Sequence, residues 1–153
     1  SGVIVFAKNA DAKRFLQDEW QGFQKVYYAV VHGTLPEKEG VITSYLTENS
    51  VYKMYSVADP TKGKLAKTSY RVLKESPRYS LLEIELLTGR KNQIRVHLAD
   101  KGCPVVGDKK YGDKKKGMKR LTLHSASLTL VHPFSKEKIT FETEIPPYFG
   151  SLF

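Results

Sequence analysis

Short segments rich in β-branched and aromatic residues, separated by glycine and proline turns, constrain this chain more than any other sequence feature. Such segments favour β-strands because branched and aromatic side chains pack well on a pleated surface. The sequence predicts strands over residues 2–7, 25–32, 41–47, 66–75, 79–87, 121–131 and 136–144. Most of these segments are joined by short turns, which connect antiparallel neighbours. We therefore expect an α+β fold with a few helices and a mixed, mainly antiparallel sheet.

Two segments carry the apolar spacing of helices instead of strands. Residues 10–21 place apolar side chains at helical intervals behind Asn9, a residue type that caps helix N-termini. Residues 91–101 place Ile94 on an apolar face, and they end before Gly102, which suits the position after a helix. Both segments are predicted to be helices.

The other stretches are expected to be irregular. Residues 48–63 read as a polar loop, residues 105–120 as a loop rich in glycine and lysine, and the pair Pro146-Pro147 as the end of the ordered core. The sequence contains no repeat and no interdomain linker, and 153 residues suffice for one domain. We expect residues 1–153 to form a single domain and the protein to be a monomer.

The charge of the chain points toward a polyanionic partner. There are 25 Lys and Arg residues against 16 Asp and Glu residues, a formal net charge of +9. A basic balance of this size favours nucleic acid, and a membrane partner is not expected because no long apolar run is present. The single cysteine, Cys103, cannot form an internal disulfide, so a reducing, cytoplasmic setting is expected.

Metal and cofactor chemistry find no support in the sequence. The four histidines are scattered without metal-ligand spacing. Phosphate-binding, dinucleotide-binding and serine-nucleophile motifs are absent from the sequence. We therefore predict neither a metal nor a cofactor.

The start of the second predicted helix is the richest candidate site. Four polar or cationic residues gather there, namely Arg90, Lys91, Asn92 and Gln93. Helix N-termini attract anions, so this cluster suits a phosphate or a carboxylate, although a solvated helix start would look the same. Arg95 follows Ile94 close to the buried face, where a guanidinium needs an acceptor such as a carboxylate.

Two further features are compatible with RNA. The loop after this helix carries a run of lysines that could follow a phosphate backbone, namely Lys109, Lys110, Lys114, Lys115 and Lys116. A solvated loop is the alternative interpretation. Tyr27 and Tyr28 would face opposite sides of a strand, so one could stack on a base, although both could equally be ordinary sheet residues.

At these places the sequence resembles the large-subunit ribosomal RNA pseudouridine synthases of the RluA type. TGRKNQIRVHL resembles the TGRxHQIRxHL motif of that family, and PVVGDKKYG resembles the GDxxYG segment that follows it. KVYYAVVHG, GKLAKTSYRVL and LHSASLTLVHP resemble three further family segments. The opening SGVIVFAKN resembles the segment after the family's HRLD motif. The resemblance extends to about Pro147.

The resemblance implies a pseudouridine synthase fold and an isomerase that converts a specific uridine of structured RNA to pseudouridine without metal or cofactor. The RNA would be ribosomal, with transfer RNA as the alternative. Tyr27 matches the tyrosine that stacks on the uracil and removes the proton from C5. Arg95 matches the arginine that pairs with the catalytic aspartate, and Ile94 is expected to line the same pocket. The other candidate residues are expected to contact the RNA backbone, namely Arg90, Lys91, Asn92, Gln93, Lys109, Lys110, Lys114, Lys115 and Lys116.

Two departures from the family pattern affect these expectations. Asn92 replaces the usual histidine, and the HRLD segment with the nucleophilic aspartate is absent from the 153 residues. The chain is thus expected to be a fragment that begins just after that aspartate and is inactive alone. The alternatives are a non-catalytic RNA-binding module and a basic ribosome-associated structural protein. Arg95 argues against a binding module, because its expected partner is the missing carboxylate and an unpaired buried arginine is costly. The structural protein predicts no pocket beside Tyr27 and Arg95.

Overall fold

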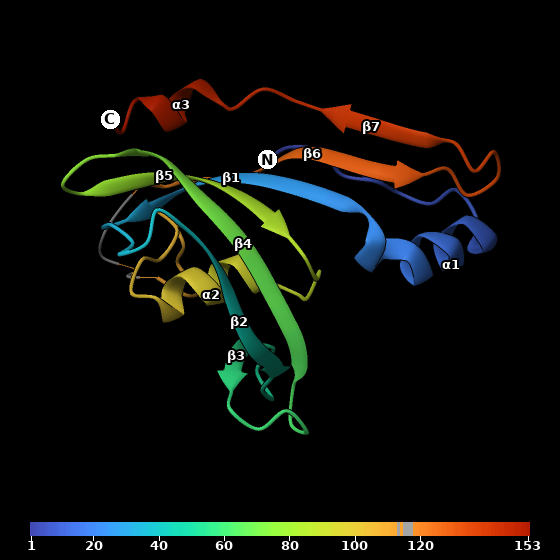
Figure 1. Ribbon diagram of the computed structural model, residues 1–153, viewed down its shortest axis with the longest axis horizontal. Helices are drawn as coiled ribbons and strands as arrows, with labels where there is room; N and C mark the ends of the chain where they lie inside the picture. Colours follow the sequence, from blue (N-terminus) through green and yellow to red (C-terminus); the bar gives the residue numbers. More distant parts are fainter. Residues whose placement is uncertain (113, 115–117) are drawn as a thin grey trace.

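Seven strands form one sheet in the computed structural model, which describes residues 1–112, 114 and 118–153. Their order is β3-β2-β4-β5-β1-β6-β7, as Figure 1 shows. The strands are β1 Gln24–His32, β2 Glu39–Glu48, β3 Met54–Val57, β4 Lys64–Glu75, β5 Tyr79–Leu86, β6 Leu123–Val131 and β7 Lys138–Glu142. All the pairings between these strands are antiparallel, which confirms the predicted fold class.

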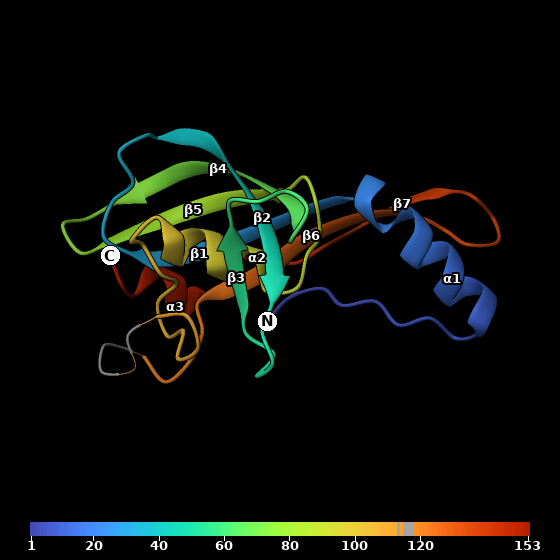
Figure 2. The ribbon, with the colours of Figure 1, turned by 90° about the horizontal axis from the view of Figure 1, so that it is seen from below.

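The helices lie at different places around this sheet. They are α1 Ala10–Glu19, a 3-10 turn at Trp20–Gly22, α2 Gln93–Asp100 and the short α3 Pro147–Gly150. Asn9 caps α1 as predicted, because its side-chain oxygen accepts the N–H of Ala12 at 2.9 Å. Leu16 of α1 packs with Leu128 and Leu130 of β6, which anchors α1 near the β6–β7 end of the sheet (Figure 2).

The main core lies between α2 and one face of the sheet. Ile94 and Leu98 of α2 are 3% and 0% exposed and pack with Ala29 and Val31 of β1. Full burial of one such aliphatic side chain contributes about 1.5–3 kcal/mol. Figure 1 shows α2 beneath the central strands and α3 on the opposite side. The sheet therefore separates two apolar layers.

The C-terminal segment belongs to the ordered core, contrary to the expectation that the core ends at Pro146-Pro147. Phe149 of α3 is 1% exposed and packs with Val30 of β1 and Val106. Its ring covers the sheet face opposite α2. The apolar side chains after the proline pair supply the burial that keeps this segment folded.

Residues 2–7 do not form the predicted strand. Gly2 makes an isolated parallel bridge with Ser125, and the segment then runs on without strand pairing. Ile4 and Phe6 are 74% and 79% exposed, whereas Val3 and Val5 pack in the α1 cluster. Alternate side chains of this segment are therefore packed against α1 and exposed to solvent. The backbone makes one isolated bridge instead of the repeated pairing that defines a strand.

The segment 48–63 contains β3, which the sequence interpretation missed. Met54 begins this strand, is 8% exposed and packs with Leu46 of β2 and Val96 of α2. Four residue pairs join β3 to β2 in an antiparallel register. One buried methionine among polar residues gives little periodic signal, so only the fold reveals the strand.

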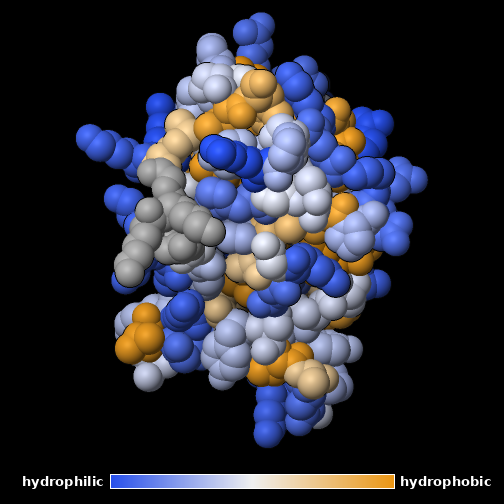
Figure 3. Space-filling view, turned by 90° about the vertical axis from the view of Figure 1, so that its left-hand side faces the viewer, coloured by the Kyte–Doolittle hydropathy of each residue, from blue (hydrophilic) through white to orange (hydrophobic). Residues whose placement is uncertain are grey.

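The surface of the molecule is largely hydrophilic on the face that Figure 3 shows. Figure 3 shows hydrophilic residues over most of one face, with apolar residues in separate patches between them. Among the described residues, no helix has the length and apolar character that crossing a membrane requires.

Gly107 provides a test of how the loop after α2 is held. Its φ is +83°, and a Cβ built there would lie 2.1 Å from the carbonyl oxygen of Arg120. Gly107→Ala should therefore lower the free energy of unfolding by at least about 2 kcal/mol, from backbone strain and the clash. Gly22→Ala is the matched control, because a Cβ there meets nothing within 4 Å. Urea denaturation of both variants checks this, and equal stabilities would contradict it.

Candidate active site

A small pocket lies where α2 faces β1, and it gathers residues from four separate segments. Its lining consists of Tyr27, Leu86, Arg90, Asn92, Gln93, Ile94, Arg95 and Leu123, and its volume is about 180 Å³. A cavity of about 150 Å³ can hold benzene, so this pocket has room for one six-membered ring. The expectation that Tyr27, Ile94 and Arg95 share a pocket agrees with this geometry. The interpretation as a basic structural protein predicted no such pocket and is wrong.

Tyr27 enters the pocket because of its strand register. It pairs with Ile84 of β5 and with Ser125 of β6, and the register against β6 shifts between Val26 and Tyr27. The shift skips Ala126 of β6, and irregularities of this kind are frequent beside active sites. Tyr28 points to the other face, where its hydroxyl donates to Glu83 Oε2 at 3.2 Å. The two tyrosines thus face opposite sides, as predicted.

Gln93 holds the turn before α2 from inside the protein. Its side chain is fully enclosed, with the residue 2% exposed. The amide oxygen accepts from the Thr88 hydroxyl at 2.7 Å and from the Arg90 N–H at 3.0 Å. The amide nitrogen donates to the Lys67 carbonyl and to Thr68 Oγ1, each at 2.9 Å. The prediction that Gln93 contacts the RNA backbone is therefore wrong, because its hydrogen-bonding groups are committed to the fold.

The predicted helix start also shifts by two residues. Helix α2 begins at Gln93 rather than at Lys91, and Asn92 before it has a left-handed backbone with φ of 55°. Asparagine tolerates this conformation better than most residues. Gly102 follows the helix with φ of +74°, as predicted for the residue after a helix end.

Arg95 has a carboxylate partner inside this chain. Its Nε donates to Asp108 Oδ2 and its Nη2 donates to Asp108 Oδ1, both at 2.8 Å. The Arg95 side chain is 21% exposed and that of Asp108 is 0% exposed. The premise that Arg95 lacks a partner within the chain is therefore wrong. Lone acidic residues in a lysine-rich loop look like solvated charges, so the sequence did not single out Asp108.

The ion pair is stabilised from both sides. Burial disfavours the charged form of Asp108, but Arg95 and the N–H groups of Tyr111 and Lys110 outweigh it, so the net pKa of Asp108 is lowered. The hydrogen bond from Arg95 to Asp108 raises the pKa of Arg95 against the effect of burial. The Tyr111 ring lies 5.0 Å from the guanidinium carbon and adds a cation–π contact. Tyr111 is a second residue that the sequence analysis missed.

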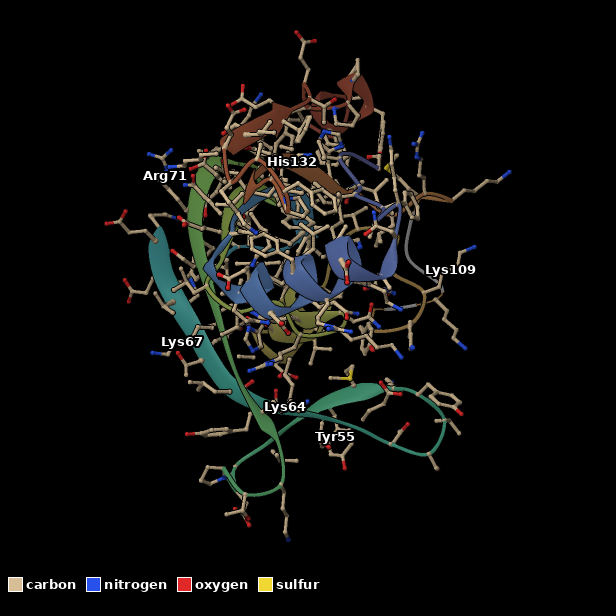
Figure 4. The ribbon with its side chains drawn as sticks, turned by 90° about the vertical axis from the view of Figure 1, so that its right-hand side faces the viewer. Tyr55, Lys64, Lys67, Arg71, Lys109 and His132 are labelled. Atoms are coloured by element: carbon tan, nitrogen blue, oxygen red, sulfur yellow. The ribbon has the colours of Figure 1, made fainter. Side chains whose placement is uncertain are left out.

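Of the predicted RNA-contacting cations, only Arg90 is among the described residues that line this pocket. Arg90 lines it and donates from Nε to the Leu65 carbonyl at 3.0 Å. Lys91 is 51% exposed and pairs with Glu48 at 3.0 Å. Lys109, Lys110 and Lys114 are exposed, whereas Lys115 and Lys116 lie outside the described residues. Figure 4 shows Lys109 on the loop after α2 and Lys64 on the projecting β2–β4 region.

A buried hydrogen-bond chain connects the turn before α2 to His97 in the middle of that helix. Thr68 Oγ1, which accepts from Gln93, lies 2.8 Å from His97 Nδ1, and Ser44 Oγ lies 2.9 Å from His97 Nε2. The tautomer of His97 decides which group donates in each of these two contacts, because a hydroxyl can both donate and accept. Burial lowers the pKa of His97 to about 4.

No metal site accompanies the pocket. Within residues 1–112, 114 and 118–153, no group of three or more His, Cys, Asp or Glu side chains is arranged to hold a metal ion. The chemistry that the pocket offers is a phenol beside a paired guanidinium, with Arg90 as a second cation in the lining.

Comparison with known proteins yields consistent matches. The sequence model of the protein family described as RNA pseudouridylate synthase matches residues 1–100. An "uncharacterized RNA pseudouridine synthase" of Chloroflexus aurantiacus is 39% identical over 150 residues, which cover 95% of this chain and 47% of the relative. The ribosomal large subunit pseudouridine synthase C of Vibrio cholerae is 35% identical over 148 residues, covering 91% of this chain and 46% of the relative.

A solved structure extends the comparison to the fold. The human RNA pseudouridylate synthase domain containing 1 aligns with a TM-score of 0.76 and 27% identity, covering 94% of this chain and 62% of that chain. The chain spans about half the length of the curated relatives it matches.

The neutral state of His97 makes stability depend on pH. Its pKa is about 4 in the folded protein and 6.5 in the unfolded reference, so the unfolded state binds more protons as pH falls below 6.5. The free energy of unfolding should decrease between pH 6.5 and 4, with His97 contributing up to about 3 kcal/mol. His97→Gln should remove that contribution, and His132→Gln should retain it. Urea titrations at several pH values across this range measure the free energy of unfolding. The same dependence of that free energy on pH in all three proteins would contradict the assignment to His97.

Proposed function

Because the chain belongs to the RNA pseudouridylate synthase family, and to its RluA type, we propose that the complete protein isomerises a uridine of structured RNA to pseudouridine. Ribosomal RNA is the proposed substrate, since relatives carry the name ribosomal large subunit pseudouridine synthase. Transfer RNA is the alternative substrate.

The observation that carries the proposal is the convergence of Tyr27, Ile94 and Arg95 on one ring-sized pocket. The target uridine would leave its RNA helix to enter the pocket, as bases must for enzymatic chemistry. The uracil would stack on Tyr27 against the apolar side of Ile94. Enclosure of the base on two sides would hold it while its glycosidic bond breaks.

The reaction conserves all atoms of the nucleotide. A nucleophilic aspartate assists cleavage of the bond between C1′ and N1, the uracil rotates, and C5 bonds to C1′. The C5 proton is then lost to Tyr27 acting as a base, and N1 gains a proton. Arg95 would hold the aspartate in its ionised form through a charge-assisted hydrogen bond.

The position of Ser1 supports this placement of the aspartate. The Ser1 amino group donates to the Leu123 carbonyl at 3.3 Å, and Leu123 lines the pocket. An extended chain spans about 3.3–3.6 Å per residue, so a residue a few positions before Ser1 could reach the pocket. An aspartate in an HRLD segment joined to Ser1 would thus be within reach of Tyr27 and Arg95.

The rim cations would hold the RNA backbone around the pocket. Arg90 and Lys91 flank the pocket turn, and Lys109, Lys110 and Lys114 follow α2 on the neighbouring loop. Lysine and arginine supply the sequence-independent part of nucleic-acid affinity. Asn92 lines the pocket itself and donates from Nδ2 to the Tyr111 hydroxyl at 3.1 Å.

A non-catalytic RNA-binding module is the second candidate, and the Arg95–Asp108 pair favours it. An arginine with a carboxylate in its own chain requires no nucleophile to compensate its charge. Such a module would retain the basic rim and the stacking tyrosine without forming pseudouridine.

Tyr27→Phe in the complete protein separates the two candidates. We expect the substitution to abolish pseudouridine formation while changing RNA affinity little, because the ring still stacks but no longer accepts a proton. Tyr28→Phe is the matched control, since Tyr28 faces away from the pocket. Tritium release from RNA labelled at C5 of uridine measures turnover. Normal turnover by Tyr27→Phe would refute its role, and inactivity of the unsubstituted protein would favour the binding module.

The 153-residue chain provides a second test. Since its sequence contains no HRLD segment, we expect it to bind structured RNA weakly and to release no tritium from the same substrate. The positive control is the complete protein. Tritium release by the purified chain would mean that its own residues provide the nucleophile.

A further inference from the structure

The Arg95 guanidinium is held along one edge, and contacts with the described residues use only some of its N–H groups. Nε and Nη2 form the side edge, which Asp108 occupies, and Nη1 donates to Asn92 Oδ1 at 3.3 Å. A guanidinium carries five N–H groups, and these contacts use three. Among the described residues, one N–H of Nη1 and one of Nη2 have no hydrogen-bond partner, and these two nitrogens bound the end edge of the guanidinium. That edge matches the spacing of two oxygens in a carboxylate.

Asp108 is itself fixed by the backbone around it. Its Oδ1 accepts the N–H groups of Lys110 and Tyr111 at 2.9 and 3.0 Å, in addition to the bond from Arg95. Gly107 precedes it in a left-handed conformation against Arg120. The carboxylate can therefore neither rotate nor withdraw without breaking backbone contacts.

Tyr111 restrains the guanidinium from its face. Its ring lies 5.0 Å from the Arg95 Cζ, and its hydroxyl accepts from the Met54 N–H and from Asn92 Nδ2, each at 3.1 Å. Three contacts thus restrict the plane and the rotation of the guanidinium: Asp108 along one edge, Asn92 beside Nη1, and Tyr111 on the face.

Burial differs between the two partners. The Asp108 side chain is 0% exposed and does not line the pocket, whereas Arg95 is 21% exposed and does line it. We propose that Asp108 is a positioning residue that fixes Arg95 side-on, so that the end edge of the guanidinium faces the pocket and receives one further carboxylate. The inference rests on the proposed function, in which that carboxylate is the nucleophilic aspartate of the complete protein.

The arrangement assigns Arg95 two carboxylates with separate tasks. Asp108 orients the guanidinium and offsets its charge, and the second carboxylate takes its orientation from the edge left open. Loss of Asp108 would let the guanidinium turn, which would misplace the nucleophile without removing it. The catalytic rate constant kcat should therefore depend on Asp108, whereas the affinity for RNA should not.

A double-mutant cycle in the complete protein tests this role. Asp108→Asn keeps an oxygen for the Lys110 and Tyr111 N–H groups but removes the charge facing Arg95. We expect kcat to fall about 10- to 100-fold with KM for RNA near that of the unsubstituted protein, whereas Tm should fall because the buried ion pair loses one charge. The double variant with Arg95→Gln should be no slower than Arg95→Gln alone, because both changes act on one interaction.

Asp100→Asn is the matched control, since Asp100 ends α2 and bonds Ser56 instead of Arg95. This variant should keep its kcat. A wild-type kcat for Asp108→Asn, or effects that multiply with those of Arg95→Gln, would overturn the proposal. If Asp108→Asn does not fold, Asp108→Glu preserves the charge but moves the carboxylate by one methylene, and wild-type kcat in that folded variant overturns it equally.

Failure of the two proposals can be told apart. If the unsubstituted complete protein makes no pseudouridine, the proposed function fails and the role of Asp108 fails with it. If that protein is active and Asp108→Asn is equally active, only the positioning role fails.

Discussion

The docking of α2 on the sheet is the constraint on which the site depends. Ile94 and Leu98 fill the apolar layer beneath β1, and Gln93 and His97 continue the contact with buried hydrogen bonds to β2 and β4. Apolar burial supplies the driving force, while polar bonds of defined length specify one rotation of the helix. A small rotation of α2 would leave buried donors unpaired, at about 1–3 kcal/mol each.

That fixed rotation determines what faces the pocket. With Ile94 directed at the sheet, Arg95 lies at the edge of the buried face, within reach of both the pocket and the loop that carries Asp108. Gln93 accepts a hydrogen bond from the Arg90 N–H and so holds the turn before α2. Arg90 and Asn92 of this turn line the pocket. Strand β1 contributes Tyr27 from the opposite wall, beside the register shift that skips Ala126 of β6. The site is thus a product of helix placement and strand register together.

The electrostatics of the site are more balanced than the net charge suggests. The formal charge of the chain is +9, yet Arg95 is neutralised locally by Asp108, and Lys91 is paired with Glu48. The exposed pair between Lys91 and Glu48 contributes little, because solvent screens it. Attraction of RNA would depend on the unpaired part of the rim, whereas Arg95 offers directed hydrogen bonds within the pocket.

The sequence by itself determined the elements with strong local signals. These include the capped helix α1, the aromatic strand β1 and the end of α2 at Gly102, because capping, β-propensity and a left-handed glycine act within a few residues. The family motifs also led to Tyr27, Ile94 and Arg95. Tertiary structure alone decided the partner of Arg95, the burial of Gln93, the pairing of β3 and the burial of Phe149. Each depends on contacts between distant segments, and a polar residue in sequence looks the same whether its partner is water or a buried carboxylate.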